Sequence, residues 1–306
     1  MQISDSISKK IDILKEKQDA LILVHNYQRP EIQDIADIVG DSFALSKQAE
    51  KSTHQVIVFC GVDFMAESAK ILCPDKIVIH PNTDAKCPMA AMVDAESLLM
   101  MKEKYHQAAV VSYVNTSAEI KALSDICCTS SNAIKIIKSL KEKKIIFVPD
   151  TNLGLYIKRF VTDKEIIIWP GICPTHHKIK KKDILQLKNN HPSAEILVHP
   201  ECNPDVIDLA DQVLSTQGMI NYVKASNQSE FIIGTEKEIC HRLNKENPTK
   251  KFYAIEKALC PNMKKITLEH VLRSLVTLSP QISLDEDIIK KAKIPLQKML
   301  TAGRGD

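Results

Sequence analysis

Glycine is scarce in this chain of 306 residues, which contains eight of them. The single Gly-x-Gly is Gly303-Arg304-Gly305, near the C-terminus, where we expect frayed chain, and no Gly-Lys-Ser/Thr occurs. Dinucleotide-binding and P-loop sites need glycines that bring backbone N–H groups close to phosphate. The sequence therefore lacks both of these phosphate-binding fingerprints, and chance is the better explanation of its terminal Arg-Gly-Asp.

The chain also lacks long apolar runs and a strong net charge. No stretch of about 18 apolar residues occurs, and the N-terminal segment has no apolar centre of signal-peptide length. The formal net charge is only +3. We therefore expect a cytoplasmic protein that binds neither nucleic acid nor a membrane.

Cysteine, in contrast, is present nine times. Because the cytoplasm keeps thiols reduced, we expect metal binding, redox chemistry or burial rather than structural disulfides. Cys87, Cys173 and Cys260 each precede a proline, at intervals of 86 and 87 residues. Cys73 also precedes a proline but has no counterpart at these intervals. We interpret the six cysteines outside the regular series as small buried side chains.

A repeat of strands and helices explains the even spacing of the three cysteines. A first strand-like run recurs as "LILVHNY", "AVVSYVN" and "EILVHPE", and a last one as "KIVIHP", "EIIIWP" and "KFYAIE". With the helical stretches between them, each unit reads βαβαβαβ followed by the cysteine. Strands that alternate with helices over short connections form parallel sheets covered by helices. We predict an α/β fold of three homologous αβα units, with parallel four-stranded sheets, around a pseudo-threefold axis.

The repeat also predicts where the units begin and end. With 44% hydrophobic residues, the chain can bury a large core. The first unit is predicted to span residues 18–90, the second 91–177 and the third 178–262. We expect an N-terminal helix over residues 1–17 and the C-terminal segment 263–306 to pack on the first unit.

Polar side chains recur at equivalent points of the three units. The first strands end at His25, Tyr113 and His199, and two residues later come Tyr27, Asn115 and Glu201. Seventeen residues after each strand end, a hydroxyl is predicted to open a helix: Ser42, Ser130 and Thr216. Ligands of parallel sheets bind beyond the carboxyl ends of the strands, and helix N-termini bind anions. A threefold arrangement would bring this polar set and the three cysteines to one centre.

Three converging cysteines indicate a metal site. A 4Fe–4S cluster has a local threefold axis, so three equivalent thiolates would hold three irons and leave the fourth open as a Lewis acid. Zinc with a fourth ligand such as His176 is the alternative, although the paired Cys-x-x-Cys of many structural zinc sites is absent. An enzyme and a non-catalytic metal sensor both remain open, and the anion-binding polar set favours the enzyme.

Several motifs, in order over residues 18–270, resemble those of the quinolinate synthase family. They are "LVHNYQ", "GDSF", "FCGVDFMAE", "TDAKCPMA", "YVNTSAEIKA", "CTSSNA", "FVPDTNLG", "HPEC" and "ALCPNM". The resemblance implies a transferase-class enzyme with an oxygen-sensitive 4Fe–4S cluster. It would condense iminoaspartate with dihydroxyacetone phosphate to quinolinate, the pyridine precursor of NAD. The resemblance also suggests transient contact with the aspartate-oxidising enzyme that supplies iminoaspartate.

The same resemblance implies roles for individual residues. The cluster ligands would be Cys87, Cys173 and Cys260. The substrate contacts would be His25, Ser42, Tyr113, Asn115, Ser130, His199, Glu201 and Thr216. The catalytic residues are predicted to be Tyr27, His199 and Glu201, with Glu201 as general base and His199 as its partner. Because no cysteine follows Cys260, redox switching through a C-terminal cysteine pair is not expected.

Overall fold

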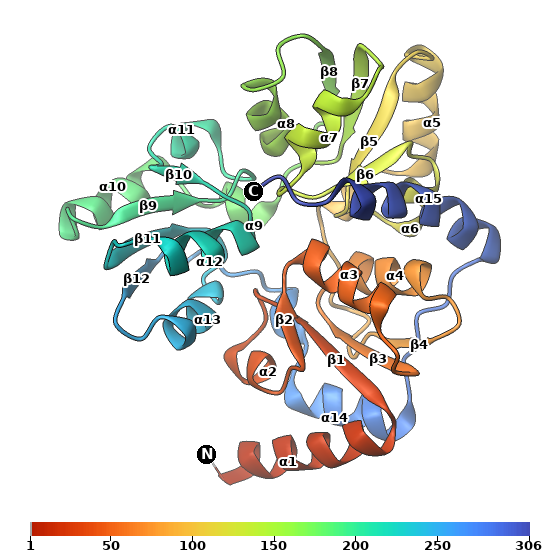
Figure 1. Cartoon of the computed structure of the whole chain (residues 1–306), viewed down its shortest axis with the longest axis vertical. Coiled ribbons are helices and arrows are strands. Elements are labelled where there is room, and N and C mark those ends of the chain that lie inside the picture. The colour runs from red at the N-terminus through yellow and green to blue at the C-terminus, as the bar shows by residue number, and fades with distance from the viewer. Residues whose placement is uncertain (1) are drawn as a thin grey trace.

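Three four-stranded sheets surround a common centre in the computed structural model, which describes residues 2–306 (Figure 1). Their strand orders are equivalent: β2-β1-β3-β4, β6-β5-β7-β8 and β10-β9-β11-β12. All neighbouring strands within the sheets are parallel. The predicted α/β fold with three αβα units is therefore confirmed.

The first sheet is preceded by a helix, α1 (Gln2–Lys17). The elements of the first sheet and its helices are β1 (Ala20–His25), α2 (Pro30–Asp34), β2 (Ile38–Gly40), α3 (Ser42–Lys51), β3 (Val56–Cys60), α4 (Asp63–Leu72) and β4 (Ile77–Ile79). Every residue of β1 and β3 is buried. Apart from His25 at the end of β1, both strands are continuous apolar runs, because helices cover the two faces of a parallel sheet.

The second sheet repeats this order of elements. They are η1 (Ala90–Met92), α5 (Ala95–Lys104), β5 (Ala109–Tyr113), α6 (Ala118–Ala122), β6 (Ile126–Cys128), α7 (Ala133–Ser139), β7 (Lys144–Val148), α8 (Thr151–Lys158) and β8 (Glu165–Ile168).

The third sheet repeats the order again. Its elements are α9 (Pro174–His177), α10 (Lys181–Asn190), β9 (Glu195–Val198), α11 (Pro204–Ile207), β10 (Gln212–Val213), α12 (Thr216–Ala225), β11 (Glu230–Gly234), α13 (Ile239–Glu246) and β12 (Lys251–Ala254). The largest apolar core contains members of all three units, including Phe59, Phe147 and Phe231 from the third strand of each.

The remaining elements follow the third sheet in the chain and pack against the first and second units. They are η2 (Met263–Lys265), α14 (Leu268–Thr277) and α15 (Glu286–Ala302). Helix α14 packs on α1, whereas α15 packs on α4 of the first unit and on α6 and β6 of the second. Figure 1 shows the chain after α15 running to the centre, where the three units meet. Across residues 2–306, each helix is too short or too polar to span a bilayer.

Candidate active site

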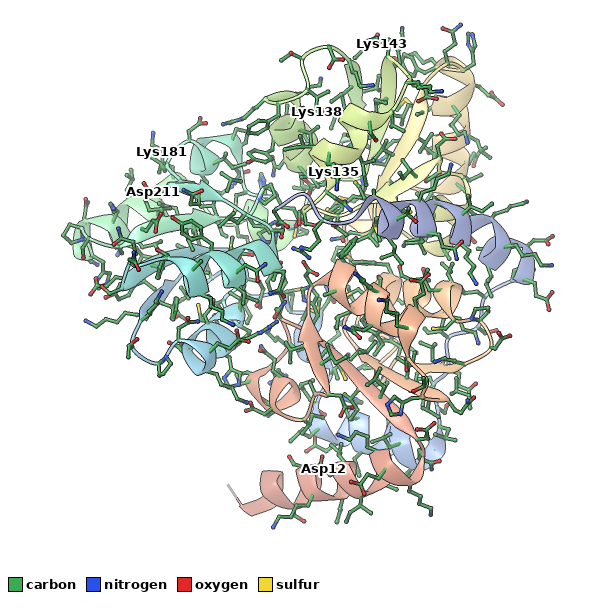
Figure 2. The ribbon with its side chains drawn as sticks, viewed as in Figure 1. Asp12, Lys135, Lys138, Lys143, Lys181 and Asp211 are labelled. Carbon is green, nitrogen blue, oxygen red and sulfur yellow. The ribbon has the colours of Figure 1, made fainter. Side chains whose placement is uncertain are left out.

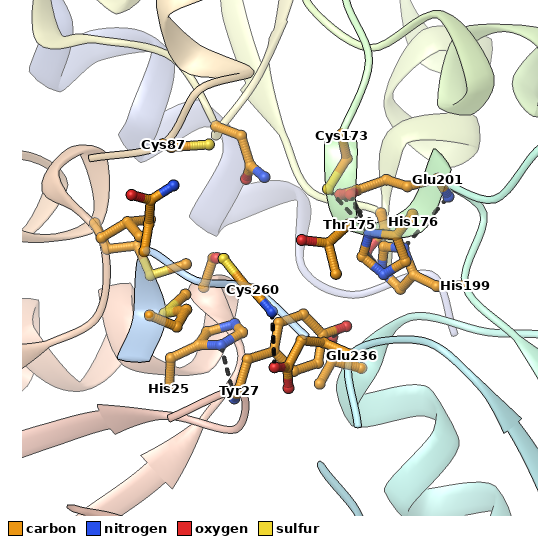
Figure 3. Close-up of a pocket in the computed structure, with 18 of the residues that line it drawn as sticks. His25, Tyr27, Cys87, Cys173, Thr175, His176, His199, Glu201, Glu236 and Cys260 are labelled. Atoms are coloured by element: carbon orange, nitrogen blue, oxygen red, sulfur yellow. Dashed lines mark hydrogen bonds and ion pairs between the residues drawn. The ribbon is translucent and has the colours of Figure 1, made fainter. Parts of the chain in front are cut away.

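A cavity lies at the centre of the molecule, where the carboxyl ends of the strands of the three units meet (Figure 3). Its lining includes all twelve residues of the predicted cluster-ligand, substrate-binding and catalytic sets: His25, Tyr27, Ser42, Cys87, Tyr113, Asn115, Ser130, Cys173, His199, Glu201, Thr216 and Cys260. The structure thus brings the whole set together, and the role of each residue stays a prediction.

Two of the predicted hydroxyls stand at the start of a helix. Ser42 is the first residue of α3, and Thr216 is the first residue of α12. The caps are the residues before them: Asp41 accepts a hydrogen bond from the N–H of Ala44 at 2.8 Å, and Ser215 caps α12 in the same way. The hydroxyls of Ser42 and Thr216 are therefore free of capping and can face a ligand beside positive helix ends.

The third hydroxyl does not open a helix, so this part of the prediction is wrong. Ser130 lies in a turn three residues before α7, which begins at Ala133. The turn forms because the side-chain oxygen of Asn132 accepts the N–H of Thr129 at 2.8 Å. The hydroxyl of Ser130 still reaches the cavity, where it lies 3.2 Å from Nε2 of His199.

Two equivalent histidines follow the same local pattern at the ends of first strands. Nδ1 of His25 accepts the N–H of Tyr27 at 3.1 Å, and Nδ1 of His199 accepts the N–H of Glu201 at 3.3 Å. Burial lowers the pKa of His25 to about 4 and that of His199 to about 3. Both imidazoles are therefore neutral at pH 7, with Nδ1 occupied and Nε2 left to donate.

Two buried tyrosines bring protonated hydroxyls into the cavity. The hydroxyl of Tyr27 lies 2.9 Å from Oγ1 of Thr216 and 2.6 Å from Oγ1 of Thr235. Tyr113 donates its hydroxyl to Oε1 of Glu201 at 2.5 Å. Burial raises the pKa of each tyrosine well above the ordinary value for a tyrosine side chain. Both phenols are therefore proton donors at neutral pH.

Glu201 is the buried carboxylate at the centre of this network. Its Oε2 lies 2.8 Å from Nδ1 of His176, whose Nε2 lies 2.8 Å from Oγ1 of Thr235. Burial acts to raise the pKa of Glu201, but His176, with His199 and Tyr113, outweighs it and holds that pKa below its ordinary value. Glu201 is thus ionised at neutral pH. From the sequence, His176 was predicted only as a possible zinc ligand. Its contact with Glu201 could not be predicted from the repeat, because the other two units have no histidine at the equivalent position.

The three proline-linked cysteines are positioned by a repeated contact that the sequence analysis missed. In each unit, a carboxylate after the third strand accepts the backbone N–H of the cysteine: Asp63 from Cys87 at 2.9 Å, Asp150 from Cys173 at 3.2 Å and Glu236 from Cys260 at 3.1 Å. The separations along the chain are 24, 23 and 24 residues. This nearly constant offset was the signal in the sequence. Each carboxylate also accepts an N–H near its own helix start.

The cysteine side chains are half-buried and line the cavity from three sides (Figure 3). Burial raises the pKa of Cys87 to about 12 and raises the pKa values of Cys173 and Cys260 above the ordinary range. Metal binding would displace these protons, since thiolates are the ligating form. Three thiols from three equivalent loops are a donor set that fits an iron–sulfur cluster.

A second group of metal-ligating atoms lies in the same cavity. The ligand atoms of Cys173, His176 and Glu201 all lie within 4.8 Å of one another. Nδ1 of His176 is 3.1 Å from Sγ of Cys173. This mixed sulfur, nitrogen and oxygen set fits the donor preferences of zinc. It shares Cys173 with the set of three cysteines.

A lysine from a highly charged segment also lines the cavity. Lys178 begins the run "KIKKKD", a charge pattern typical of a solvated helix face or turn. Among the lining residues described, it is the single lysine or arginine. Lys178 is exposed, lies in the turn that follows the short helix α9, and brings positive charge to the cavity wall.

The fold and this cavity define a three-unit α/β protein with a thiol-lined polar site at its centre. The family model described as quinolinate synthetase A protein matches residues 9–301. A quinolinate synthase of Thermodesulfovibrio yellowstonii is 55% identical over 294 residues, which cover 96% of this chain and 97% of that relative. Another, of Methanosarcina barkeri, is 53% identical over 293 residues, covering 95% and 96%. The chain belongs to the quinolinate synthase family.

Proposed function

We propose that this chain condenses iminoaspartate with dihydroxyacetone phosphate to quinolinate, phosphate and water, as a transferase of NAD biosynthesis. The observation that carries the proposal is the cavity at the centre of the three units. It places one cysteine of each unit beside the polar set that suits anionic substrates. Membership of the family supports this proposal, and the two substrates balance the products without an added oxidant or reductant.

We propose that Cys87, Cys173 and Cys260 hold one 4Fe–4S cluster. When bound, such a cluster supplies a Lewis-acid iron that can polarise a substrate oxygen. The protein's part is to fix the three cysteine loops, which Asp63, Asp150 and Glu236 do by accepting backbone N–H groups.

The substrates would be held by neutral donors and by one cation. Hydroxyls at the starts of α3 and α12 stand beside positive helix ends, which favour carboxylate and phosphate groups. The hydroxyl of Ser130, the side-chain amide of Asn115 and the ammonium of Lys178 line the same space. The absence of a glycine-rich loop is therefore compatible with phosphorylated and dicarboxylate substrates.

Proton transfer would be shared by the central network. Glu201 is ionised and can accept a proton, while the protonated hydroxyls of Tyr27 and Tyr113 and the Nε2–H of His199 can donate one. Glu201 already accepts from Tyr113 and His176, so these two neighbours hold its carboxylate in place and stabilise its negative charge. We propose Glu201 as the general base and His199 as its partner.

A second candidate function rests on the set Cys173, His176 and Glu201. These three residues could bind a single zinc ion in a non-catalytic metal protein. Such a site would need neither Cys87 nor Cys260. It would also make no use of the hydroxyls at the helix starts.

Metal analysis distinguishes the two candidates. We would purify the protein without oxygen and count iron, sulfide and zinc per chain, for the wild type and for Cys87→Ser and Cys260→Ser. The proposed cluster requires close to four irons and four sulfides in the wild type and their loss in both variants. One zinc, with no sulfide and no effect of either substitution, would contradict the cluster and favour the second candidate.

The cellular setting follows from the proposed chemistry. A cluster with an iron open to substrate needs a reducing compartment, so we place the enzyme in the cytoplasm. Transient contact with the aspartate-oxidising enzyme that supplies iminoaspartate stays a prediction.

A further inference from the structure

The segment Gly303–Asp306 after α15 lies at the meeting point of the three units (Figure 1). Gly305 donates its N–H to the carbonyl oxygen of Ser131 at 2.9 Å. The side-chain amide of Asn132 donates to the carbonyl oxygen of Gly303 at 3.0 Å. The expectation of frayed chain is therefore wrong, because the segment is tied to the loop that carries Ser130.

Arg304 in this segment joins helix caps from two different units. Its Nη1 donates to Oδ2 of Asp41 at 2.8 Å, and its Nη2 donates to Oγ of Ser215 at 3.0 Å. Asp41 caps α3 and Ser215 caps α12. A single guanidinium therefore connects the two helix starts whose first residues are Ser42 and Thr216.

Asp306 fixes the orientation of this guanidinium. Its Oδ1 accepts from Nε of Arg304 at 3.1 Å, and its Oδ2 accepts from the hydroxyl of Ser215. The central carbon of the guanidinium lies 5.7 Å from the centre of the Phe43 ring, and Phe43 lines the cavity. Charge-assisted bonds of this kind are about twice as strong as neutral ones, so the contact is a strong link between the units.

Glycines on both sides of the contact show how closely the segment fits. A Cβ on Gly305 would lie 2.8 Å from the carbonyl oxygen of Ser131, and one on Gly218 would lie 2.6 Å from Oδ2 of Asp306. Gly303 has a φ of +70°, which other residues rarely adopt. Lys135, labelled in Figure 2 near this segment, donates to the carbonyl oxygen of Arg304 at 3.2 Å. The three glycines and the contact with Lys135 therefore allow the segment to pack closely against its neighbours.

We propose that Arg304 is a positioning residue and that Gly303–Asp306 is a strap that holds the starts of α3 and α12 in the arrangement that binds the anionic substrates. The identity of those substrates rests on the proposed function. Arg304 does not line the cavity and acts through Asp41 and Ser215. Arginine suits this task because its planar fork reaches several acceptors at once, whereas a lysine ammonium is a single point charge.

The test compares Arg304→Ala and Arg304→Lys with Lys290→Ala, a substitution at an exposed lysine of α15. Hydrogen exchange followed by mass spectrometry should show faster exchange in the first turns of α3 and α12 in Arg304→Ala, and unchanged exchange in α13. Steady-state assays without oxygen should show KM for at least one substrate raised about tenfold, the scale of a lost helix cap. The value of kcat per cluster should change much less. Arg304→Lys should lie between wild type and Arg304→Ala, and Lys290→Ala should match the wild type.

Each result supports or overturns a definite part of the inference. Unchanged exchange at both helix starts in Arg304→Ala would overturn the strap, whether or not the protein makes quinolinate. Faster exchange with both KM values within about twofold of wild type would overturn the positioning of substrate. A wild-type protein that makes no quinolinate would overturn the proposed function, and the positioning of substrate with it. The exchange data would still show whether the strap holds the starts of α3 and α12.

Discussion

The hydroxyl of Tyr113 donates to Oε1 of Glu201 across 2.5 Å and so joins the second unit to the third inside the cavity. Glu201 accepts from His176 through its other oxygen. The carboxylate therefore needs its negative charge to keep both neighbours in place. Its pKa, held below the ordinary value despite burial, keeps that charge at neutral pH.

Replacing Glu201 with glutamine tests its proposed role as general base. Glutamine keeps the shape of the side chain but cannot accept a proton, so turnover should fall by at least about 100-fold. Quinolinate formation per cluster and the melting temperature should be measured together, with the exposed Glu286→Gln as control. Near-normal turnover per cluster in Glu201→Gln would remove the base assignment. A large loss of iron would indicate a structural role instead.

The carboxylates behind the cysteines give a second prediction. Asp150 accepts the N–H groups of Cys173 and Leu153, so Asp150→Ala leaves two buried donors unpaired at a cost of about 1–3 kcal/mol each. We expect lower stability and lower iron and sulfide content. Asp150→Asn, which keeps an acceptor oxygen, should retain more of both. Asp12→Ala on the exposed face of α1 is the control (Figure 2). Wild-type cluster content and stability in Asp150→Ala would show that the contact is dispensable.

Part of this site could be predicted from the sequence, because repeat spacing is preserved in the fold. Residues at strand ends, such as His25 and Tyr113, recur at fixed offsets and reach the same centre. His176 and Lys178 could not be found in this way, since they occur in one unit only. The strap could not be predicted either. Its partners Asp41 and Ser215 are distant in sequence, and Gly303–Asp306 carries no apolar period that would indicate packing.

Strands β2, β6 and β10 are also difficult to predict from the sequence. They contain three, three and two residues. Such runs are too short to display the alternation that identifies a strand. Their place at the edge of each sheet is set by pairing with the longer first strand of the unit. The order of the longer elements was nevertheless sufficient for the predicted βαβαβαβ unit.

The buried neutral histidines predict an acid-sensitive fold. The pKa of His25 is about 4 in the folded protein, against about 6.5 in an unfolded chain. Below pH 6.5 the unfolded chain therefore binds a proton that the folded one does not, and stability falls as the pH drops from 6.5 towards 4. At pH 5.5 His25 alone should cost about 1.4 kcal/mol.

Denaturant unfolding at pH 7.5 and 5.5 checks this pH dependence. His25→Gln should lose less stability between the two values than the wild type, because one of the titrating groups is gone. The exposed His106→Gln should behave like the wild type, since this side chain makes no buried contact to lose. An equal loss of stability in the wild type and His25→Gln would contradict the assignment.

The most direct test of the central claim is quinolinate formation by the wild-type protein. The enzyme would be purified without oxygen, its cluster content determined, and iminoaspartate and dihydroxyacetone phosphate supplied together. We predict quinolinate in proportion to cluster content, with one phosphate released for each quinolinate, and none when either substrate is omitted. Protein with a full cluster that forms no quinolinate from both substrates would contradict the proposed function.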